Sequence, residues 1–255
     1  MLLTFDIGNS HSVAGLWHER ELVQTLRLTT EPQRTADEWY LLLKMWLSGS
    51  GKELAFKSAA VSSVVPAANA ALKEAFEIAG IENPFWLGAS SPLNFTFDYP
   101  SAQSLGADRL ADAVAAVFYY GPNVVVVDFG TAITFSVVTE KIFQGGVIAP
   151  GITSSLESLF NATAKLPKMA FKRTTHAWGK TTGESIEIGA YIGWRGVVRE
   201  ILAEIKNSLP RKGQDHKVIA TGGIAESLDF APEFFDSVDK NLTLRGLYLA
   251  ATQVL

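Results

Sequence analysis

Short apolar runs that are typical of strands alternate along this chain with segments of helical periodicity. In the first half, strands are expected at residues 2–7, 12–17, 22–28, 59–65 and 85–87, and helices at 39–47, 67–79 and 107–120. A capping-box pattern at residues 35–38 and Pro66 at a first helical position indicate two helix starts. Gly49 and Gly51 are expected to close the first helix, and residues 94–106 form an aromatic, turn-rich loop.

The pattern begins again after Gly121 and Pro122. Four consecutive valines at 124–127 are typical of a strand that is covered on both faces. Further strands are expected at residues 133–139, 143–148 and 218–220, and helices at 152–160, 185–209 and 242–254.

The two halves share a motif. Residues 5–12 and 127–134 match as an apolar residue, Asp, an apolar residue, Gly, a small polar residue, and a hydroxyl residue four positions after the Gly. Each copy follows an apolar strand and leads into another strand. This repetition predicts a duplicated α/β fold with domains at 1–120 and 121–255 and a boundary near Tyr120.

Composition excludes several classes of function. The chain has 255 residues, a net charge of −4 and no cysteine, so a disulfide framework, a catalytic thiol and a cysteine zinc site are excluded. The absence of a long basic run argues against nucleic acid as a partner. No uncharged apolar stretch of about 18 residues suggests a membrane span. The N-terminus begins directly with a strand rather than a signal peptide, so a cytoplasmic location is expected.

A tight Asp-x-Gly turn between two strands is suited to binding phosphate. Glycine lets a ligand approach the backbone, and successive N–H groups can form a concavity that binds anions. The aspartate can hold a cation that neutralises the phosphates. The alternative is two ordinary turns in which Asp6 and Asp128 accept local hydrogen bonds, but the matched pair favours phosphate. No P-loop pattern occurs in the chain.

Two further loops are candidate ligand sites. Gly222 and Gly223 lie between a strand and a helix, where a flat group such as adenine with its ribose can lie against the backbone; a plain glycine-rich turn is the alternative. Gly106-Ala107-Asp108-Arg109 opens a helix. Asp108 could accept the proton of a substrate hydroxyl and Arg109 could bind a carboxylate or phosphate, or Asp108 could only complement the helix dipole.

These motifs together resemble those of type III pantothenate kinases, in the superfamily of acetate and sugar kinases, heat-shock protein 70 and actin. Residues 6–10 and 128–132 resemble the two phosphate motifs, 106–109 the pantothenate motif and 221–223 the adenosine motif. Three other stretches, at 61–66, 145–151 and 244–247, are also similar to the family. The resemblance implies two ribonuclease H-like, actin-like lobes with an ATP cleft between them, a homodimer, and phosphorylation of pantothenate to 4'-phosphopantothenate in coenzyme A biosynthesis.

The resemblance also implies residue roles. Asp108 is the base for the pantothenate hydroxyl, and Asp128 binds a monovalent cation, K⁺ or NH₄⁺. Asp6 would hold Mg²⁺ through ATP. The residues that contact ATP are Asp6, Gly8, Asn9, Ser10, Thr131, Gly222 and Gly223. The residues of the pantothenate pocket are Tyr99, Gly106, Ala107, Asp108, Arg109 and Thr182.

Two positions depart from the family pattern. Thr181 stands where asparagine is usual, and Ser10 stands where many members have threonine, which keeps the hydroxyl. Gly189, Gly193 and Gly196 lie on one side of a predicted helix, which indicates close packing against another helix, for example at a subunit interface. Two alternatives stay open: a sugar or acetate kinase of the same superfamily, and a regulatory protein that keeps the fold without catalysis.

Overall fold

The computed structural model describes residues 1–48, 58–163 and 166–253. The chain divides into two compact units, one formed by Met1–Tyr119 with Asn241–Leu255 and the other by Tyr120–Lys240. The expected closure of the first helix at Gly49 and Gly51 lies outside the described residues.

The sheet of the first unit has the strand order β3-β2-β1-β4-β5. Strands β1 (Leu2–Ile7), β2 (His11–His18) and β3 (Glu21–Thr29) are antiparallel neighbours, and β4 (Ser58–Ser63) and β5 (Phe85–Trp86) continue the sheet in parallel with β1. The other elements of this unit are α1 (Ala36–Ser48), α2 (Pro66–Ile78), β6 (Thr96–Phe97), the 3-10 turn Ala102–Ser104, α3 (Ala107–Tyr120) and α7 (Leu242–Thr252).

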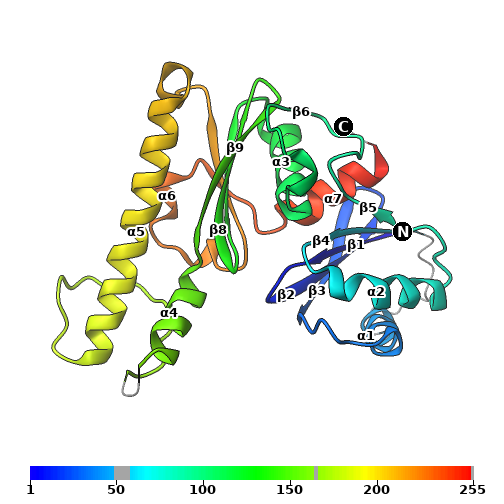
Figure 1. Cartoon of the computed structure of the whole chain (residues 1–255), viewed down its shortest axis with the longest axis horizontal. Coiled ribbons are helices and arrows are strands. Elements are labelled where there is room, and N and C mark those ends of the chain that lie inside the picture. Colours follow the sequence, from blue (N-terminus) through cyan, green and yellow to red (C-terminus); the bar gives the residue numbers. More distant parts are fainter. Residues whose placement is uncertain (49–57, 164–165, 254–255) are drawn as a thin grey trace. The chain divides into compact units, whose positions relative to one another are not determined.

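Helices cover both faces of this first sheet (Figure 1). On one face, α1 and α2 bury one apolar side each, and the ring of Phe76 meets that of Phe5 edge-on at 5.3 Å between centroids. On the other face, α7 contacts β1 and β4. Helix α7 lies so close to α3 that a Cβ on Gly246 would overlap the carbonyl of Ala111. The expected division at residue 120 placed this last helix with the second half, whereas in the structure it completes the core of the first unit.

Within the second unit, the strands that residues 120–240 contribute to the sheet run in the order β11-β10-β7-β8-β9. Strands β7 (Val124–Phe129), β8 (Ala132–Thr139) and β9 (Ile142–Pro150) are antiparallel neighbours, and β10 (Lys217–Thr221) and β11 (Ser237–Val238) are parallel with β7. Helices α4 (Ile152–Asn161), α5 (Thr182–Ser208) and α6 (Ala231–Phe234) and the 3-10 turns Pro210–Gly213 and Ala225–Ser227 complete this unit. Val198 and Leu202 of α5 pack into its core.

The two sheets repeat one topology. In both, the order is third, second, first, fourth and fifth strand, and the fifth strand has only two residues. Asp6 pairs with Ser62 in the first sheet, and Asp128 pairs with Thr221 at the equivalent place in the second. The ladder between the second and third strands also shifts register within one residue of the same point in each sheet, after Leu16 and after Val137. The predicted duplicated α/β fold is therefore confirmed.

Candidate functional site

The first Asp-x-Gly motif forms the turn between β1 and β2. The N–H of Gly8 donates to the carbonyl of His11 at 3.1 Å, while Asn9 and Ser10 are exposed at the tip. Asp6 lies just before the turn, and its carboxylate accepts a hydrogen bond of 3.1 Å from the hydroxyl of Ser62, which is fully buried. A fixed carboxylate therefore stands beside exposed backbone and side-chain donors.

The loop before α3 places Asp108 in the first helical turn. Its Oδ1 accepts the N–H of Arg109 at 2.7 Å. A Cβ on Gly106 would overlap this oxygen, so glycine is required for the carboxylate to fold back over the loop. Burial raises the pKa of Asp108 above its ordinary value, against the opposing effects of the Arg109 N–H and guanidinium. A raised pKa is suited to a carboxylate that must take up a proton.

Arg109 is nearly buried, at 8% exposure, and three acidic groups surround it. Burial lowers the pKa of Arg109. The negative charges of Asp108, Tyr99 and Asp112 act in the opposite direction, and that of Asp108 has the largest effect of the three. Asp112 is held in turn by the hydroxyl of Thr243 at 2.7 Å. The predicted pocket residues Tyr99, Asp108 and Arg109 are thus brought together in one cluster.

This cluster and the first turn lie at the same end of the first sheet. Val64 directly follows β4, and its N–H donates to the carbonyl of Ile7 at 3.0 Å. A Cβ on Gly106 would lie 3.4 Å from the side chain of Val64. Val64 therefore connects the end of β1 to the loop that carries Asp108.

The second Asp-x-Gly motif forms the turn between β7 and β8, where Gly130 donates to the carbonyl of Ala132 at 3.1 Å. Gly222 has a φ of +99°, and a Cβ there would overlap the carboxylate of Asp128 and lie 2.6 Å from the nitrogen of Phe129. Only glycine fits this close approach with positive φ. The structure thus brings Asp128 and Gly222 together, with Gly223 exposed beside them.

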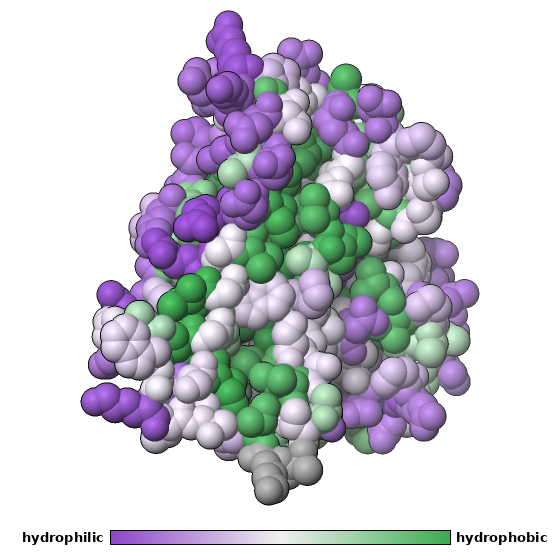
Figure 2. All heavy atoms as spheres, turned by 60° about the vertical axis from the view of Figure 1, so that its left-hand side comes forward, coloured by the Kyte–Doolittle hydropathy of each residue, from purple (hydrophilic) through white to green (hydrophobic). Residues whose placement is uncertain are grey.

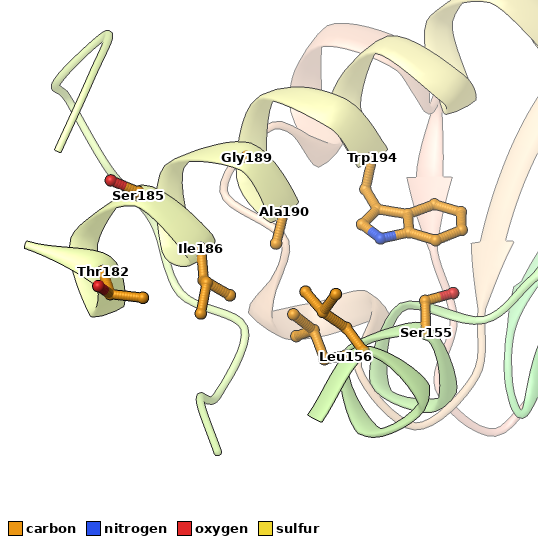
Figure 3. A pocket seen from close by; sticks show the side chains of 9 residues that line it. Ser155, Leu156, Thr182, Ser185, Ile186, Gly189, Ala190 and Trp194 are labelled. Carbon is orange, nitrogen blue, oxygen red and sulfur yellow. The ribbon is translucent and has the colours of Figure 1, made fainter. Parts of the chain in front are cut away.

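Helix α4 supports the second turn from its other side. Ser154 donates its hydroxyl to the carbonyl of Thr131 at 2.5 Å, and Gly151 packs directly against the same carbonyl. Ser155, the next residue on α4, lines a groove of about 430 Å³ together with Thr182. Figure 3 shows Leu156 of α4 and Ile186 and Ala190 of α5 pointing toward one another across it.

Thr182 begins α5, and Thr181 is its N-cap. The hydroxyl of Thr181 accepts the N–H of Glu184 at 3.2 Å, while the carboxylate of Glu184 accepts the N–H of Lys180 at 2.7 Å. This pair resembles a capping box, except that Glu184 accepts the N–H of the residue before the N-cap. Threonine and asparagine both serve as N-caps, so the substitution at position 181 preserves the helix start.

A family model for type III pantothenate kinases matches residues 2–204, which is most of the chain. The chain belongs to this family. The matched region contains both Asp-x-Gly turns, the loop of Asp108 and the start of α5. Membership of the type III pantothenate kinase family and the fold together indicate a nucleotide-binding kinase that uses ATP with a divalent metal.

Three solved structures of similar fold are distant from this chain in sequence. A Campylobacter jejuni protein assigned to the Baf family of transcriptional activators has a TM-score of 0.58 and 22% identity over 99% of this chain and 100% of that one. A Porphyromonas gingivalis protein assigned as an N-acetylglucosamine kinase has a TM-score of 0.54 and 14% identity, with coverage of 99% and 100%. The activator of 2-hydroxyisocaproyl-CoA dehydratase from Clostridium difficile, with bound ADPNP, has a TM-score of 0.55 and 12% identity, with coverage of 99% and 93%. These likenesses show the shared duplicated fold of kinases and actin-like proteins.

Three supporting hydroxyl residues were missed by reasoning from the sequence. Ser62 holds Asp6, Ser154 holds the second turn, and Thr30 holds the first turn. Each is far along the chain from the motif that it supports, and serine and threonine are common in loops and strands. No local pattern could have identified them.

Proposed function

We propose that this protein transfers the γ-phosphoryl group of ATP to the hydroxyl of pantothenate and so forms 4'-phosphopantothenate, the first step of coenzyme A biosynthesis. The observation that carries the proposal is the Asp108 carboxylate of raised pKa, at the same sheet end as the Asp6 turn. Membership of the type III pantothenate kinase family supports the choice of substrate.

In the proposed reaction, the substrate hydroxyl oxygen forms a bond to the γ-phosphorus while the bond from that phosphorus to the bridging oxygen breaks, and ADP leaves. The hydroxyl proton passes to Asp108. Arg109 and Tyr99, with Gly106, Ala107 and Thr182, bind the substrate. Such transfer depends mainly on positioning and on neutralising phosphate charge, and backbone N–H groups at Gly8–Ser10 and Thr131 are suited to this task.

The residues also fit the expected ions. Magnesium in kinases is commonly held by one or two carboxylates together with the phosphates, and Asp6 beside the first turn offers one carboxylate. Among the described residues, no cluster of three or more acidic, His or Cys side chains forms a complete metal cage, which agrees with a shared ion. For the monovalent cation, Asp128 has a second oxygen nearby on the adjacent strand. Thr221, which pairs with Asp128, is 1% exposed, and its Oγ1 has no hydrogen-bond partner in the described part of the chain.

A homodimer is also proposed, with a second copy covering the groove of α4 and α5. Figure 2 shows hydrophobic side chains gathered on the face that these helices turn toward the viewer. Leu159 is 43% exposed and Ile192 is 51% exposed on this surface. A Cβ on any of the three glycines at 189, 193 and 196 would meet no described atom within 4 Å. An open glycine furrow beside exposed apolar side chains is suited to another helix.

Light scattering tests the dimer. Ile192→Arg should convert a dimer to monomers because an unpaired charge would be buried at the contact. Met45→Arg is the matched control, since Met45 is 73% exposed on α1 of the other unit. A parent protein that is monomeric and fully active at the assay concentration would contradict the proposal.

The activity is tested by ADP formation from ATP and Mg²⁺ with pantothenate, with and without potassium. Pantothenate-dependent ADP formation that potassium stimulates is expected. Sugars and acetate in the same assay test the other kinase activities. Absence of ADP formation with every substrate, despite ATP binding, would instead favour the regulatory alternative. None of the helices in the part of the chain that the structure describes could span a membrane.

A further inference from the structure

Thr30 holds the turn between β1 and β2 by donating hydrogen bonds to two carbonyl groups of that turn. It directly follows β3 and is 7% exposed. Its hydroxyl donates to the carbonyl of Gly8 at 2.7 Å, and its backbone N–H donates to the carbonyl of Ser10 at 3.0 Å. Both carbonyls at the tip are therefore turned toward the interior of the first unit.

A second buried hydroxyl supports the first. Ser12 Oγ lies 2.8 Å from Thr30 Oγ1, and Ser12 is 2% exposed. A carbonyl can only accept, and a hydroxyl has a single proton to donate. Because Thr30 gives its proton to Gly8, the proton between the two hydroxyls must come from Ser12. The direction of the relay is thus fixed: Ser12 donates to Thr30, and Thr30 donates to Gly8.

The relay determines where the amide of Asn9 points. In a trans peptide the C=O and N–H of one plane point in opposite directions, and the described chain has no cis peptide. The carbonyl of Gly8 points to Thr30, so the N–H of Asn9 in the same peptide points away from Thr30. That direction leads out of the exposed tip, where an anion can reach the N–H.

We propose that Thr30 is a positioning residue for nucleotide phosphate. It aims the Asn9 N–H by holding the Gly8 carbonyl, and Ser12 orients the Thr30 hydroxyl. The inference rests on the proposed function, since it assigns ATP phosphate to this turn. Neither residue touches the ligand, so the effect must appear as a loss of nucleotide affinity that exceeds any loss of fold stability.

The test compares ATP binding by calorimetry in Thr30→Val, Thr30→Ser and Thr4→Val. Thr30→Val removes the hydroxyl at nearly constant shape and should weaken ATP binding roughly tenfold, the equivalent of one lost hydrogen bond. Thr30→Ser keeps the hydroxyl and should restore most of the affinity. Thr4→Val is the matched control, since Thr4 is fully buried in the same sheet and its hydroxyl accepts the indole N–H of Trp17 at 2.9 Å. It should lower Tm but leave ATP affinity unchanged.

Equal ATP affinity in the parent and in a folded Thr30→Val would overturn the inference, as would an equal loss in Thr4→Val. If Thr30→Val does not fold, Ser12→Ala takes its place and should weaken ATP binding by a smaller factor. A parent protein that binds no ATP would overturn the proposed function. The NMR amide signal of Asn9 tests the positioning role separately, because Thr30→Val should shift this signal while Thr4→Val should not. An unchanged Asn9 signal in Thr30→Val would contradict the positioning role.

Discussion

The two Asp-x-Gly turns are built on the same hairpin but are supported from different elements. The first turn is held by Thr30 at the end of its third strand. The second is held by Ser154, in the helix that follows its third strand. Support from α4 links the second turn to the groove where Thr182 lies, because Ser155 is part of that groove. The two units thus share the hairpin, while the hydroxyl that fixes the turn comes from a different element in each.

The hydroxyl residue beside the aspartate also differs between the two turns. Ser62 donates a hydrogen bond to Asp6, whereas Thr221, at the equivalent place beside Asp128, has a buried oxygen with no hydrogen-bond partner in the described residues. A buried oxygen without a partner is costly unless a ligand satisfies it. The hydroxyl beside Asp6 is therefore already bonded, whereas the proposed monovalent cation would supply the missing partner of the Thr221 oxygen.

The largest expected effect concerns Asp108, for which the second unit has no equivalent. Asp108→Asn should lower kcat by about 100- to 10,000-fold, because the substrate hydroxyl loses its proton acceptor. ATP binding should survive, since both turns are untouched. Asp112→Asn is the control, and it should mainly lower Tm because Asp112 is buried and bonded to Thr243. Steady-state kinetics and a separate binding measurement check this; a larger kcat loss in Asp112→Asn would reverse the assignment.

The same residue predicts a pH dependence. A base must be ionised to act, and burial raises the pKa of Asp108. Turnover should therefore fall as pH is lowered through a value above the ordinary range for aspartate. The residual turnover of Asp108→Asn should lack this acid limb. An unchanged acid limb in the variant would assign the titration to another group.

The next largest effect distinguishes the carboxylate of Asp6 from that of Asp128 by the ion that each is proposed to bind. Asp6→Asn should raise the KM for Mg-ATP by at least about tenfold, because a ligand of the ion is lost. Asp128→Asn should instead blunt activation by potassium and leave the magnesium requirement in place. Titrations of both ions on both variants measure the contrast. Identical responses in the two variants would mean that the turns are not specialised.

A smaller effect tests how tightly each turn is packed. A Cβ on Gly8 would lie 3.0 Å from the carbonyl of His11, whereas on Gly130 the nearest atom, the carbonyl of Ala132, would be 3.4 Å away. Gly8→Ala should destabilise the protein by about 1–3 kcal/mol, the usual range for overpacking. Gly130→Ala should cost less. Thermal unfolding ranks the pair, and the opposite ranking would refute the difference in packing.

The smallest effect is in stability without ions. Thr221→Val replaces a buried hydroxyl that lacks a partner and should stabilise the protein by about 1 kcal/mol in potassium-free buffer. Ser62→Ala should destabilise it by a similar amount, because Asp6 loses its hydrogen bond. Denaturant unfolding measures both. Added potassium should reduce the difference in free energy of unfolding between Thr221→Val and the parent. An unchanged difference would mean that the cation binds elsewhere.

The sequence predicted what is local. Asp-x-Gly between apolar strands identified both turns, and their repetition predicted the duplicated fold. The two-residue strands β6 and β11 were not predicted, because runs this short have no periodicity to detect. Helix α5 begins at Thr182 rather than at 185 because the Thr181 hydroxyl caps it by accepting the N–H of Glu184, and the Thr-x-x-Glu pattern of this cap was present in the sequence. The site roles and the dimer stay predictions.

The contacts that support the two turns could not be predicted, because they depend on how neighbouring strands are aligned in the sheet. Ser62 meets Asp6 only because β4 pairs with β1 in parallel at one register, and Thr30 reaches Gly8 only because β3 ends where it does. Neither depends on a nearby sequence pattern. The requirement for Gly222 was likewise hidden, since it comes from the backbone of β7 on the adjacent strand.

Helix α7 affects the order in which the chain folds during synthesis. Residues 120–240 form a continuous unit, whereas the first unit needs α7 to cover one face of its sheet. The buried residues that α7 supplies include Leu242, Leu244, Leu247 and Leu249. On the ribosome, the second unit can therefore finish first, although its codons are read later. Until α7 emerges, the first sheet has an apolar face without its cover, so this is the interval in which the nascent chain is most exposed to aggregation and most dependent on chaperones.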